Sequence, residues 1–158
     1  MEMDVFLGGA SEVEILEFKV GKNPYGININ DIKEILPYDK APTPVPNSHP
    51  FIEGIIIPRE VVLPIVNLGA CFGVKESNDD NNDMNIVANI NNMNIAFHVD
   101  SVSGIHSVGK DEIKELNKKI SINIKNEIIG VFERENRTIE IIDLRKIIAN
   151  LNSEISVG

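Results

Sequence analysis

The stretch that decides the fold is GIIIPREVVLPIVNLGACFG, residues 54–73. Two apolar runs, residues 54–57 and 61–66, flank the polar turn at residues 58–60. Both runs are too continuously apolar for a sheet with one solvated face, so they predict strands packed inside a small barrel or sandwich. The turn must be solvated, and a charged turn on a rigid hairpin can present Arg59 to a partner.

A short helix is expected after the second of these strands. Asn67 is suited to cap its first turn, because an asparagine side chain accepts hydrogen bonds from backbone N–H groups that are unpaired there. Three apolar residues then follow at helical spacing: Leu68, Cys71 and Phe72. Cys71 is the single cysteine of the chain. It excludes an intramolecular disulfide and a thiolate metal cluster, and we expect a buried, inert thiol.

The same pattern recurs in GVFERENRTIEIIDLRKIIA, residues 130–149. Each copy reads as a strand, a charged turn with an arginine, a second strand, an Asn or Asp cap, and a helix. In both copies a glycine precedes the cap by thirteen positions, and Leu144, Ile147 and Ile148 repeat the apolar helical stripe. Any hairpin followed by a capped helix resembles this pattern. The equal spacing favours duplication, which predicts two related β units.

Composition limits the classes of function. The chain has 158 residues, of which 42% are apolar and 25% charged, which suits one ordinary domain or two small β subdomains that share a core. No apolar run reaches the roughly 18 residues that cross a bilayer, and the N-terminus has no basic n-region. With one cysteine, these features predict a reduced, cytoplasmic location. The net charge of −9 and 5% aromatic content argue against nucleic acid and anionic membranes as partners.

Alternating apolar residues predict several further strands: residues 13–20, 25–29, 84–90, 93–99 and 100–108. Residues 31–36 fit a helical turn or a strand, and a turn followed by a strand is the preferred interpretation. Lys110–Ile120 predicts a short amphipathic helix with Ile113, Leu116 and Ile120 on one side. Before the first strand, residues 1–12 form a polar lead that we expect to be flexible.

Two segments without regular structure complete the pattern. Residues 37–50 contain five prolines, which exclude a helix or a central strand. A stiff surface connector is favoured over a ligand for an SH3 or WW domain, because the segment lies inside the domain. Residues 75–83 are rich in Asn and Asp and predict a solvated loop. A calcium loop is rejected there, since Met84 and Ile90 occupy the places where glycine and glutamate are required.

No catalytic constellation is present in the sequence. There is no glycine-rich phosphate loop between a strand and a helix, and no HEXXH motif. His98 and His106 lie eight positions apart without a cysteine ligand nearby, which is more typical of structural histidines than of a metal pair. The residues alone therefore favour an acidic, β-rich interaction module over an enzyme. They predict no cofactor and do not identify the partner.

Four stretches resemble the coupling-protein domain of bacterial chemotaxis, the CheW family. They lie between about Glu14 and Leu151, and their order and spacing are more specific than any one of them: Tyr25-Gly26-Ile27 with residues 32–35; Val45-Pro46-Asn47 with residues 51–54; Arg59 with residues 62–68; and residues 99–102. The resemblance is closest to the N-terminal domain of CheV, from residues 12–18, 45–50 and 97–106. CheV proteins carry a receiver domain after this module, and none follows Gly158. A stand-alone coupling protein and a shortened CheV both fit.

The resemblance implies a mainly β fold of two packed, five-stranded SH3-like barrels with a few short helices, including a C-terminal one. The expected organisation is a lead at residues 1–12, a domain at residues 13–151 and a tail at residues 152–158. Within the domain, the first β unit covers about 13–75 and the second about 84–151, with exchange of elements between them allowed.

The resemblance also implies a function without catalysis, cofactor or metal. Such a module bridges the cytoplasmic tip of a chemoreceptor and the regulatory domain of the histidine kinase CheA, without entering the membrane. The receptor helix tip is expected in an apolar groove between the barrels. The alternative is an unrelated SH3-like or OB-like module, for example one that binds a peptide.

Five residues are expected at partner contacts: Glu34, Arg59, Val61, Val99 and Ser101. In the family, an acidic residue at the place of Glu34 and an arginine at the place of Arg59 matter for coupling. This chain departs from the family at two points. Glu60 stands where a glycine is usual, and Asn67 stands where an aspartate is usual. The resemblance therefore leaves the conformation of the turn and the orientation of Arg59 open.

Overall fold

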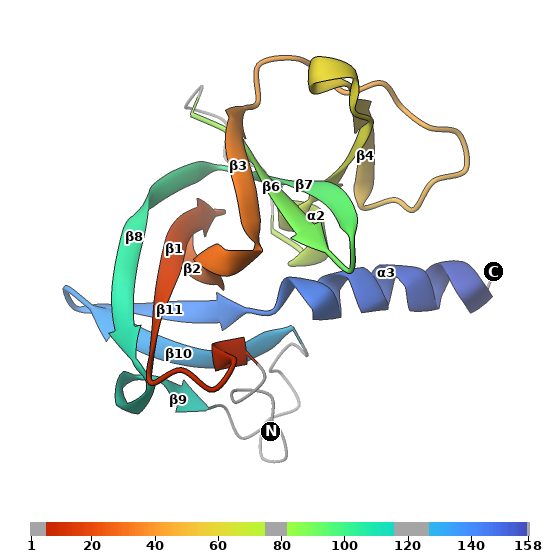
Figure 1. Ribbon diagram of the computed structural model, residues 1–158. Helices are drawn as coiled ribbons and strands as arrows, with labels where there is room; N and C mark the ends of the chain where they lie inside the picture. The colour runs from red at the N-terminus through yellow and green to blue at the C-terminus, as the bar shows by residue number, and fades with distance from the viewer. Residues whose placement is uncertain (1–5, 75–81, 116–126, 158) are drawn as a thin grey trace.

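The computed structural model describes residues 6–74, 82–115 and 127–157, with side chains of the last segment described to residue 151. The strands are β1 (Glu12–Val20), β2 (Asn23–Asn28), β3 (Ile32–Pro37), β4 (Ile52–Ile56), β5 (Leu63–Asn67), β6 (Met84–Ile90), β7 (Met93–Val99), β8 (Ser101–Gly109), β9 (Lys114–Glu115), β10 (Ile128–Arg134) and β11 (Arg137–Ile142). The helices are η1 (Ile29–Asp31), η2 (Pro58–Glu60), α2 (Leu68–Cys71), η3 (Lys110–Glu112) and α3 (Leu144–Val157). The predicted mainly β class is confirmed (Figure 1).

The strands form two sheets. One has six strands in the order β8-β1-β2-β11-β10-β9, and the other has five in the order β3-β6-β7-β5-β4. Five strands were expected in each, and the sixth strand of the larger sheet is the two-residue β9. Together the sheets form the two β subdomains of the predicted fold, and α3 extends from the end of β11 past the lower edge of the second sheet (Figure 1).

Each sheet combines strands from both halves of the chain. The hairpin β4-β5 joins the second sheet through a parallel pairing of Ile65 with Ala96 on β7. The hairpin β10-β11 joins the first sheet through a parallel pairing of Ile141 with Gly26 on β2. The two copies of the repeated pattern therefore occupy equivalent places, each beside a hairpin from the other half of the chain.

The predicted cap and apolar stripe of the first repeat are confirmed. The Asn67 side chain accepts a hydrogen bond of 3.0 Å from the backbone N–H of Ala70, which satisfies one free donor of α2. Leu68 and Phe72 are buried, whereas Cys71 is only half-buried, so the expectation of a buried thiol is wrong. In the second repeat, Leu144 is 1% exposed and packs in the core.

The main core lies between the sheets and includes side chains from both sheets and from α3, among them Phe18, Phe97, Leu68, Leu144 and Ile147. A second cluster fills the six-stranded sheet around Ile15, Phe132 and Ile139. A smaller third cluster, Leu63, Ile65, Val87 and Ala96, fills the five-stranded sheet. Central strands such as β1 are therefore buried on both faces.

The helix predicted over residues 110–120 is wrong where the structure describes it. Lys110–Glu112 forms the single 3-10 turn η3, and Lys114–Glu115 forms β9, which pairs Glu115 with Gly130 of β10. Ile113 is buried between them, so its apolar character reflects packing beside a sheet edge rather than a helical stripe. Residues 116–126, which include Leu116 and Ile120, lie outside the described residues.

The ends of the predicted domain also differ from expectation. Phe6 and Leu7, assigned to a flexible lead, are buried in the cluster of the six-stranded sheet, and Asn28 donates a hydrogen bond of 3.0 Å to the Phe6 carbonyl. The terminal helix continues through Val157. None of the described helices combines the length and apolar character that a membrane span requires.

Candidate functional site

The candidate site is centred on an ion pair between Glu34 and Arg59, two of the five contact residues predicted from the sequence. Arg59 lies in η2, directly after β4, and its guanidinium donates to both carboxylate oxygens of Glu34 on β3. The side chain of Arg59 is 71% exposed and that of Glu34 is 26% exposed. The pair therefore joins the two edge strands of the five-stranded sheet while Arg59 remains open to a partner.

The backbone of the turn explains how Arg59 reaches Glu34. Arg59 has φ 51° and Glu60 has φ 71°, so two consecutive non-glycine residues adopt left-handed conformations. Such conformations strain an L-residue with a side chain, and a glycine at the position of Glu60 would relieve that strain. Glu60 adopts this conformation, and the guanidinium of Arg59 still reaches Glu34 on β3.

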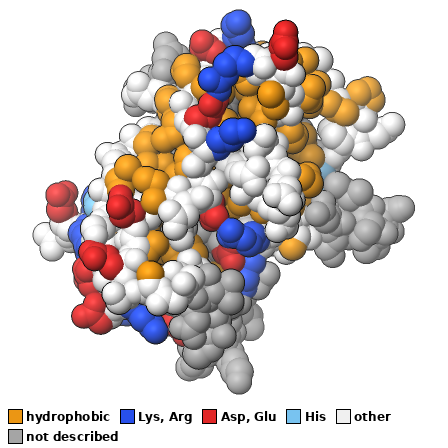
Figure 2. All heavy atoms as spheres, viewed as in Figure 1, with side chains coloured by type: hydrophobic (Ala, Val, Ile, Leu, Met, Phe, Trp, Pro, Cys, Tyr) orange, Lys and Arg blue, Asp and Glu red, His pale blue; other side chains and the backbone are white. Residues whose placement is uncertain are grey.

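Exposed apolar side chains surround the turn. Ile57 is 60% exposed, Val61 46% and Val62 54%, and all three lie within three residues of Arg59. In Figure 2, hydrophobic side chains gather over the upper half of the face, where Figure 1 places β3 and β4. Large apolar side chains grouped on a surface are typical of a protein–protein contact.

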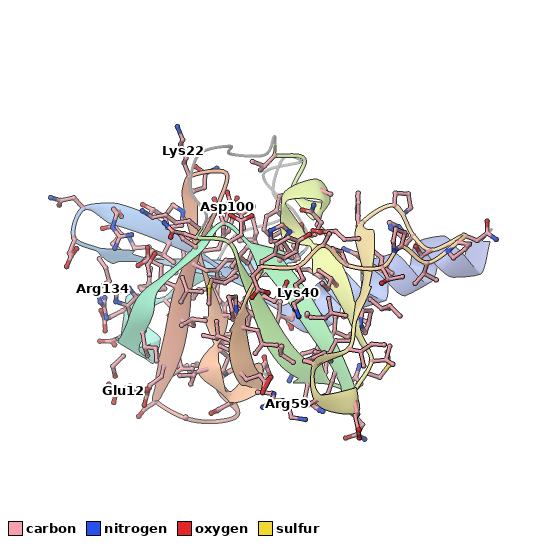
Figure 3. The ribbon with its side chains drawn as sticks, turned by 90° about the horizontal axis from the view of Figure 1, so that it is seen from above. Glu12, Lys22, Lys40, Arg59, Asp100 and Arg134 are labelled. Atoms are coloured by element: carbon pink, nitrogen blue, oxygen red, sulfur yellow. The ribbon has the colours of Figure 1, made fainter. Side chains whose placement is uncertain are left out.

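Two of the predicted contact residues lie elsewhere. Val99 is 1% exposed and belongs to the main core, so its side chain is not available for a direct surface contact. Ser101 is half-buried at the start of β8. Asp100, which lies between them in the chain, appears at the opposite end of the view from Arg59 (Figure 3). The structure thus brings Glu34, Arg59 and Val61 together and separates Val99 and Ser101 from them.

A second polar cluster links the same two edge strands away from Arg59. Tyr38, which follows β3, donates a hydrogen bond to Glu53 on β4. His98 on β7 lies between two carboxylates, with Nδ1 2.5 Å from Glu53 Oε2 and Nε2 2.7 Å from Asp83 Oδ2. The ring of His98 also stacks on that of Tyr38, with centroids 3.8 Å apart and planes inclined by 9°.

These contacts change the proton affinities of the cluster. Burial alone would lower the pKa of His98, but hydrogen bonds to Glu53 and Asp83 outweigh it, so the pKa lies above its ordinary value. Burial alone would raise the pKa of Glu53, but hydrogen bonds from His98 and Tyr38 outweigh it and lower that pKa. Both effects favour an imidazolium held between two carboxylates.

Sequence reasoning missed this cluster. Tyr38 and Glu53 are 15 residues apart, and Glu53 and His98 are 45 residues apart, so no local motif connects them. The one available signal was a histidine, His98, inside a predicted strand, since an imidazole that becomes buried needs hydrogen-bond partners.

The six-stranded sheet contains a buried carboxylate of its own. Glu17 on β1 is 1% exposed; Arg137 donates to it from both terminal guanidinium nitrogens, Nη1 and Nη2, and His106 Nε2 lies 2.7 Å from its Oε1. Burial alone would raise the pKa of Glu17, but these hydrogen bonds outweigh it, so the pKa lies below its ordinary value. Thus an arginine of each repeated hairpin pairs with a glutamate on another strand of its sheet.

The His98 cluster is not arranged for nucleophilic catalysis, and no metal site is found among the described residues. Both nitrogens of His98 face carboxylates, so the imidazole has no free position from which to activate a nucleophile. Within the described ranges, no group of three or more His, Cys, Asp or Glu side chains is placed to hold a metal ion. The arrangement instead suits a rigid surface that presents charge and apolar side chains together.

Comparisons with known proteins agree with this description. The family model for the CheW-like domain matches residues 14–152. The chain is 30% identical to the chemotaxis protein CheW of Rhizobium meliloti, over 83% of this chain and 84% of that one. It is 26% identical to CheW of Thermotoga maritima, over 94% and 96% of the two chains. The crystal structure of a scaffolding protein, TtCheW from Thermoanaerobacter tengcongensis, superposes with a TM-score of 0.75 at 24% identity, over 83% of this chain and 88% of that one.

Proposed function

The chain belongs to the CheW-like domain family, and from this premise we propose that it is a chemotaxis adaptor that couples chemoreceptors to the histidine kinase CheA. In this role it is a scaffold and catalyses no reaction. The observation that supports a binding role most directly is the exposed Glu34–Arg59 pair with Ile57, Val61 and Val62 around it. Charge and apolar surface in one place provide both specificity and buried area to a protein interface.

The partners are the regulatory domain of CheA and the cytoplasmic tip of a chemoreceptor, and the protein works in the cytoplasm. Glu34, Arg59 and Val61 form the contact with the kinase. Ser101 contributes to a separate contact, and Val99 supports it from the core beneath, since its side chain is buried.

We also propose that the chain is related most nearly to the N-terminal domain of CheV. This relation is supported by the resemblance of residues 12–18, 45–50 and 97–106 to that domain. His98 is enclosed by Glu53 and Asp83, and His106 contacts the buried Glu17.

A charge-reversal series tests the kinase contact by titration calorimetry against the regulatory domain of CheA from the same organism. Arg59→Glu places two carboxylates opposite each other and removes the exposed cation, so we expect at least tenfold weaker binding. Glu34→Arg has the same effect by placing two cations together. The double variant restores the pair with opposite polarity. If the pair serves only the fold, the double variant should recover folding stability and kinase binding. If the partner recognises the sign of the charge, binding should stay weak although folding stability is recovered.

The controls separate binding from folding. Arg134 is an arginine of the other repeat and pairs with Glu112, so Arg134→Glu is the matched control and should leave kinase binding unchanged. Circular dichroism and urea unfolding should show that Arg59→Glu remains folded, because an exposed ion pair contributes only about 0–1 kcal/mol. Unchanged affinity in Arg59→Glu would overturn the contact assignment. If the wild-type chain bound neither kinase nor receptor, an unrelated peptide-binding role would become the better interpretation.

A further inference from the structure

The edge strands of the five-stranded sheet are joined by side chains at two places. Strand order puts β3 and β4 at opposite edges, and the described β pairings contain no ladder between them. Arg59, after β4, bonds to Glu34 of β3 at one place, and Tyr38, after β3, bonds to Glu53 of β4 at the other. We call the boundary between these two links the seam.

A hollow of about 280 Å³ opens at the seam. Its walls come from both edges and are mostly apolar: Leu36, Pro37, Ile56, Ile57 and Pro58. Asp39 and Lys40 also line it and supply its charged groups. Pockets for small molecules and cofactors usually measure about 300–1,000 Å³, so this volume suits a single large side chain better than a cofactor.

The hollow is also lined by a polar group that lacks a partner. Asn85 on β6 is 2% exposed, and its side-chain oxygen Oδ1 accepts no hydrogen bond from the residues that the structure describes. Buried polar atoms are nearly always paired, because an unpaired acceptor has lost its water without gaining a replacement. The oxygen itself exposes less than 1 Å², so an N–H or O–H group entering the hollow would supply the missing hydrogen bond once the Asn85 side chain turns toward it.

We propose that the seam hollow binds one aromatic side chain that carries a hydrogen-bond donor, a tryptophan or tyrosine, from the protein that docks on Glu34 and Arg59. The apolar walls accommodate the ring and Asn85 Oδ1 accepts the N–H or O–H. The exposed Ile57 extends the apolar contact at the mouth. Tryptophan and tyrosine combine a large apolar body with one polar atom, as this hollow requires. The choice of occupant rests on the proposed adaptor function; the chemistry of the hollow does not.

The chemistry is tested on the intact protein with indole as probe and N-methylindole as its match without an N–H. Both are titrated into ¹⁵N-labelled protein and followed by NMR. We expect saturable shifts at Leu36, Ile56, Ile57 and the Asn85 side-chain amide, with indole bound about fivefold more tightly than N-methylindole, as for one hydrogen bond to a buried acceptor. Equal affinity for the two probes, or shifts confined to other surfaces, would overturn the proposal.

Two variants test the assignment of the site further. Asn85→Leu keeps a side chain of similar size but removes the acceptor, so indole and N-methylindole should then bind equally. Ile57→Asp places a charge at the mouth and should weaken both probes at least tenfold. Its matched control is Ile105→Asp on β8 of the other sheet, because Ile105 is 53% exposed and Ile57 is 60% exposed. If Ile105→Asp reduced probe binding as strongly, the site would not lie at the seam.

The partner is tested by titrating the CheA regulatory domain into the same variants. We expect Ile57→Asp to weaken its binding about tenfold, Ile105→Asp to leave it unchanged, and saturating indole to compete with it. Binding of the regulatory domain that is lost in Arg59→Glu but unaffected by Ile57→Asp and indole would overturn the occupant while keeping the adaptor function. Failure of the wild-type chain to bind the regulatory domain would reject that partner, and the probe titration would still decide the chemistry of the hollow.

Discussion

Gly54, the first residue of the stretch that decides the fold, is required by two local constraints. Its φ of +150° lies in a region that residues with side chains rarely adopt. A Cβ atom there would lie 2.3 Å from the carbonyl oxygen of Thr43, and Thr43 is held in place because it exchanges two backbone hydrogen bonds of 2.9 Å with Ile55. Because Gly54 has no side chain, the proline-rich connector can lie directly against β4.

Gly54→Ala should therefore destabilise the protein more than backbone strain alone would. Gly104 is the matched control, because its φ of +147° is similar but nothing lies within 4 Å of a Cβ placed there. We expect Gly104→Ala to lower the free energy of unfolding by about 1–3 kcal/mol and Gly54→Ala to lower it by at least about 1 kcal/mol more. Urea unfolding measures both. Equal losses would show that Thr43 moves aside without cost.

At the scale of single residues, the sequence marked positions without revealing their contacts. The resemblance selected Glu34 and Arg59 separately, but their 25-residue separation gives no indication that they pair. Val99 belonged to a recognised motif, yet its apolar side chain serves the core. A motif marks a position without distinguishing a partner contact from packing, and only burial makes that distinction.

Among the elements, the terminal helix α3 is docked on the rest of the protein through its first turns. Leu144 and Ile147 pack into the main core, and Arg145 donates a hydrogen bond of 2.7 Å to Asp31 beside β3. Leu144→Ala should lower the free energy of unfolding by about 2–5 kcal/mol, because it leaves a cavity between the sheets. Asn150→Ala, at an exposed position of the same helix, should change it by less than about 0.5 kcal/mol. A loss below about 0.5 kcal/mol in Leu144→Ala would contradict docking of α3.

The polar cluster around His98 connects β3, β4 and β7, and its contribution to folding stability should depend on pH through His98. The charged form of His98 is favoured by Glu53 and Asp83. Its other polar neighbours are the stacked Tyr38 and two asparagines that lie opposite it on adjacent strands, Asn67 and Asn85. Asp100 and His98 both line a cavity at this cluster. Because the pKa of His98 is raised on folding, its contribution to stability is complete below about 6.5 and declines as pH rises through the higher folded pKa.

Glu53 has the opposite dependence. Its pKa is lowered on folding, so its contribution is complete above about 4.5 and is lost as pH falls through the lower folded pKa. The cluster therefore stabilises most between these values. Comparing urea unfolding of wild type and His98→Gln, we expect the wild-type advantage to be largest near pH 5.5, about 1–3 kcal/mol, and to shrink by pH 9. An advantage that is constant across this range would contradict a charged imidazole.

Element prediction succeeded where apolar periodicity was long and failed where it was short. The strands from Val13 and from Met84 extend over enough alternating residues to distinguish a period of two from a helical period. In residues 110–120 only three apolar positions supported a helix, and Ile113 occupies its place because β9 pairs with β10. Sheet pairing between distant segments determined the conformation there, and a local pattern does not contain that information.

For the molecule as a whole, the exchange of hairpins makes the two halves of the chain interdependent. The β4-β5 hairpin of the first half completes the sheet of β6 and β7, while the β10-β11 hairpin of the second half completes the sheet of β1 and β2. The main core then takes side chains from both halves, such as Phe18 and Phe97. The repeated pattern was visible in the sequence, but equal spacing does not reveal which hairpin each copy joins.

Dividing the chain between residues 78 and 79 tests this interdependence, because each fragment then lacks a hairpin of its sheets and exposes its share of the core. We expect neither fragment alone to give a cooperative urea transition by circular dichroism, since each leaves apolar strands unpaired. An equimolar mixture should recover the spectrum and a single transition, with a midpoint that depends on concentration because folding has become an association. A fragment that unfolds cooperatively alone, with an m-value about half that of the intact chain, would instead show that one β unit is an autonomous domain.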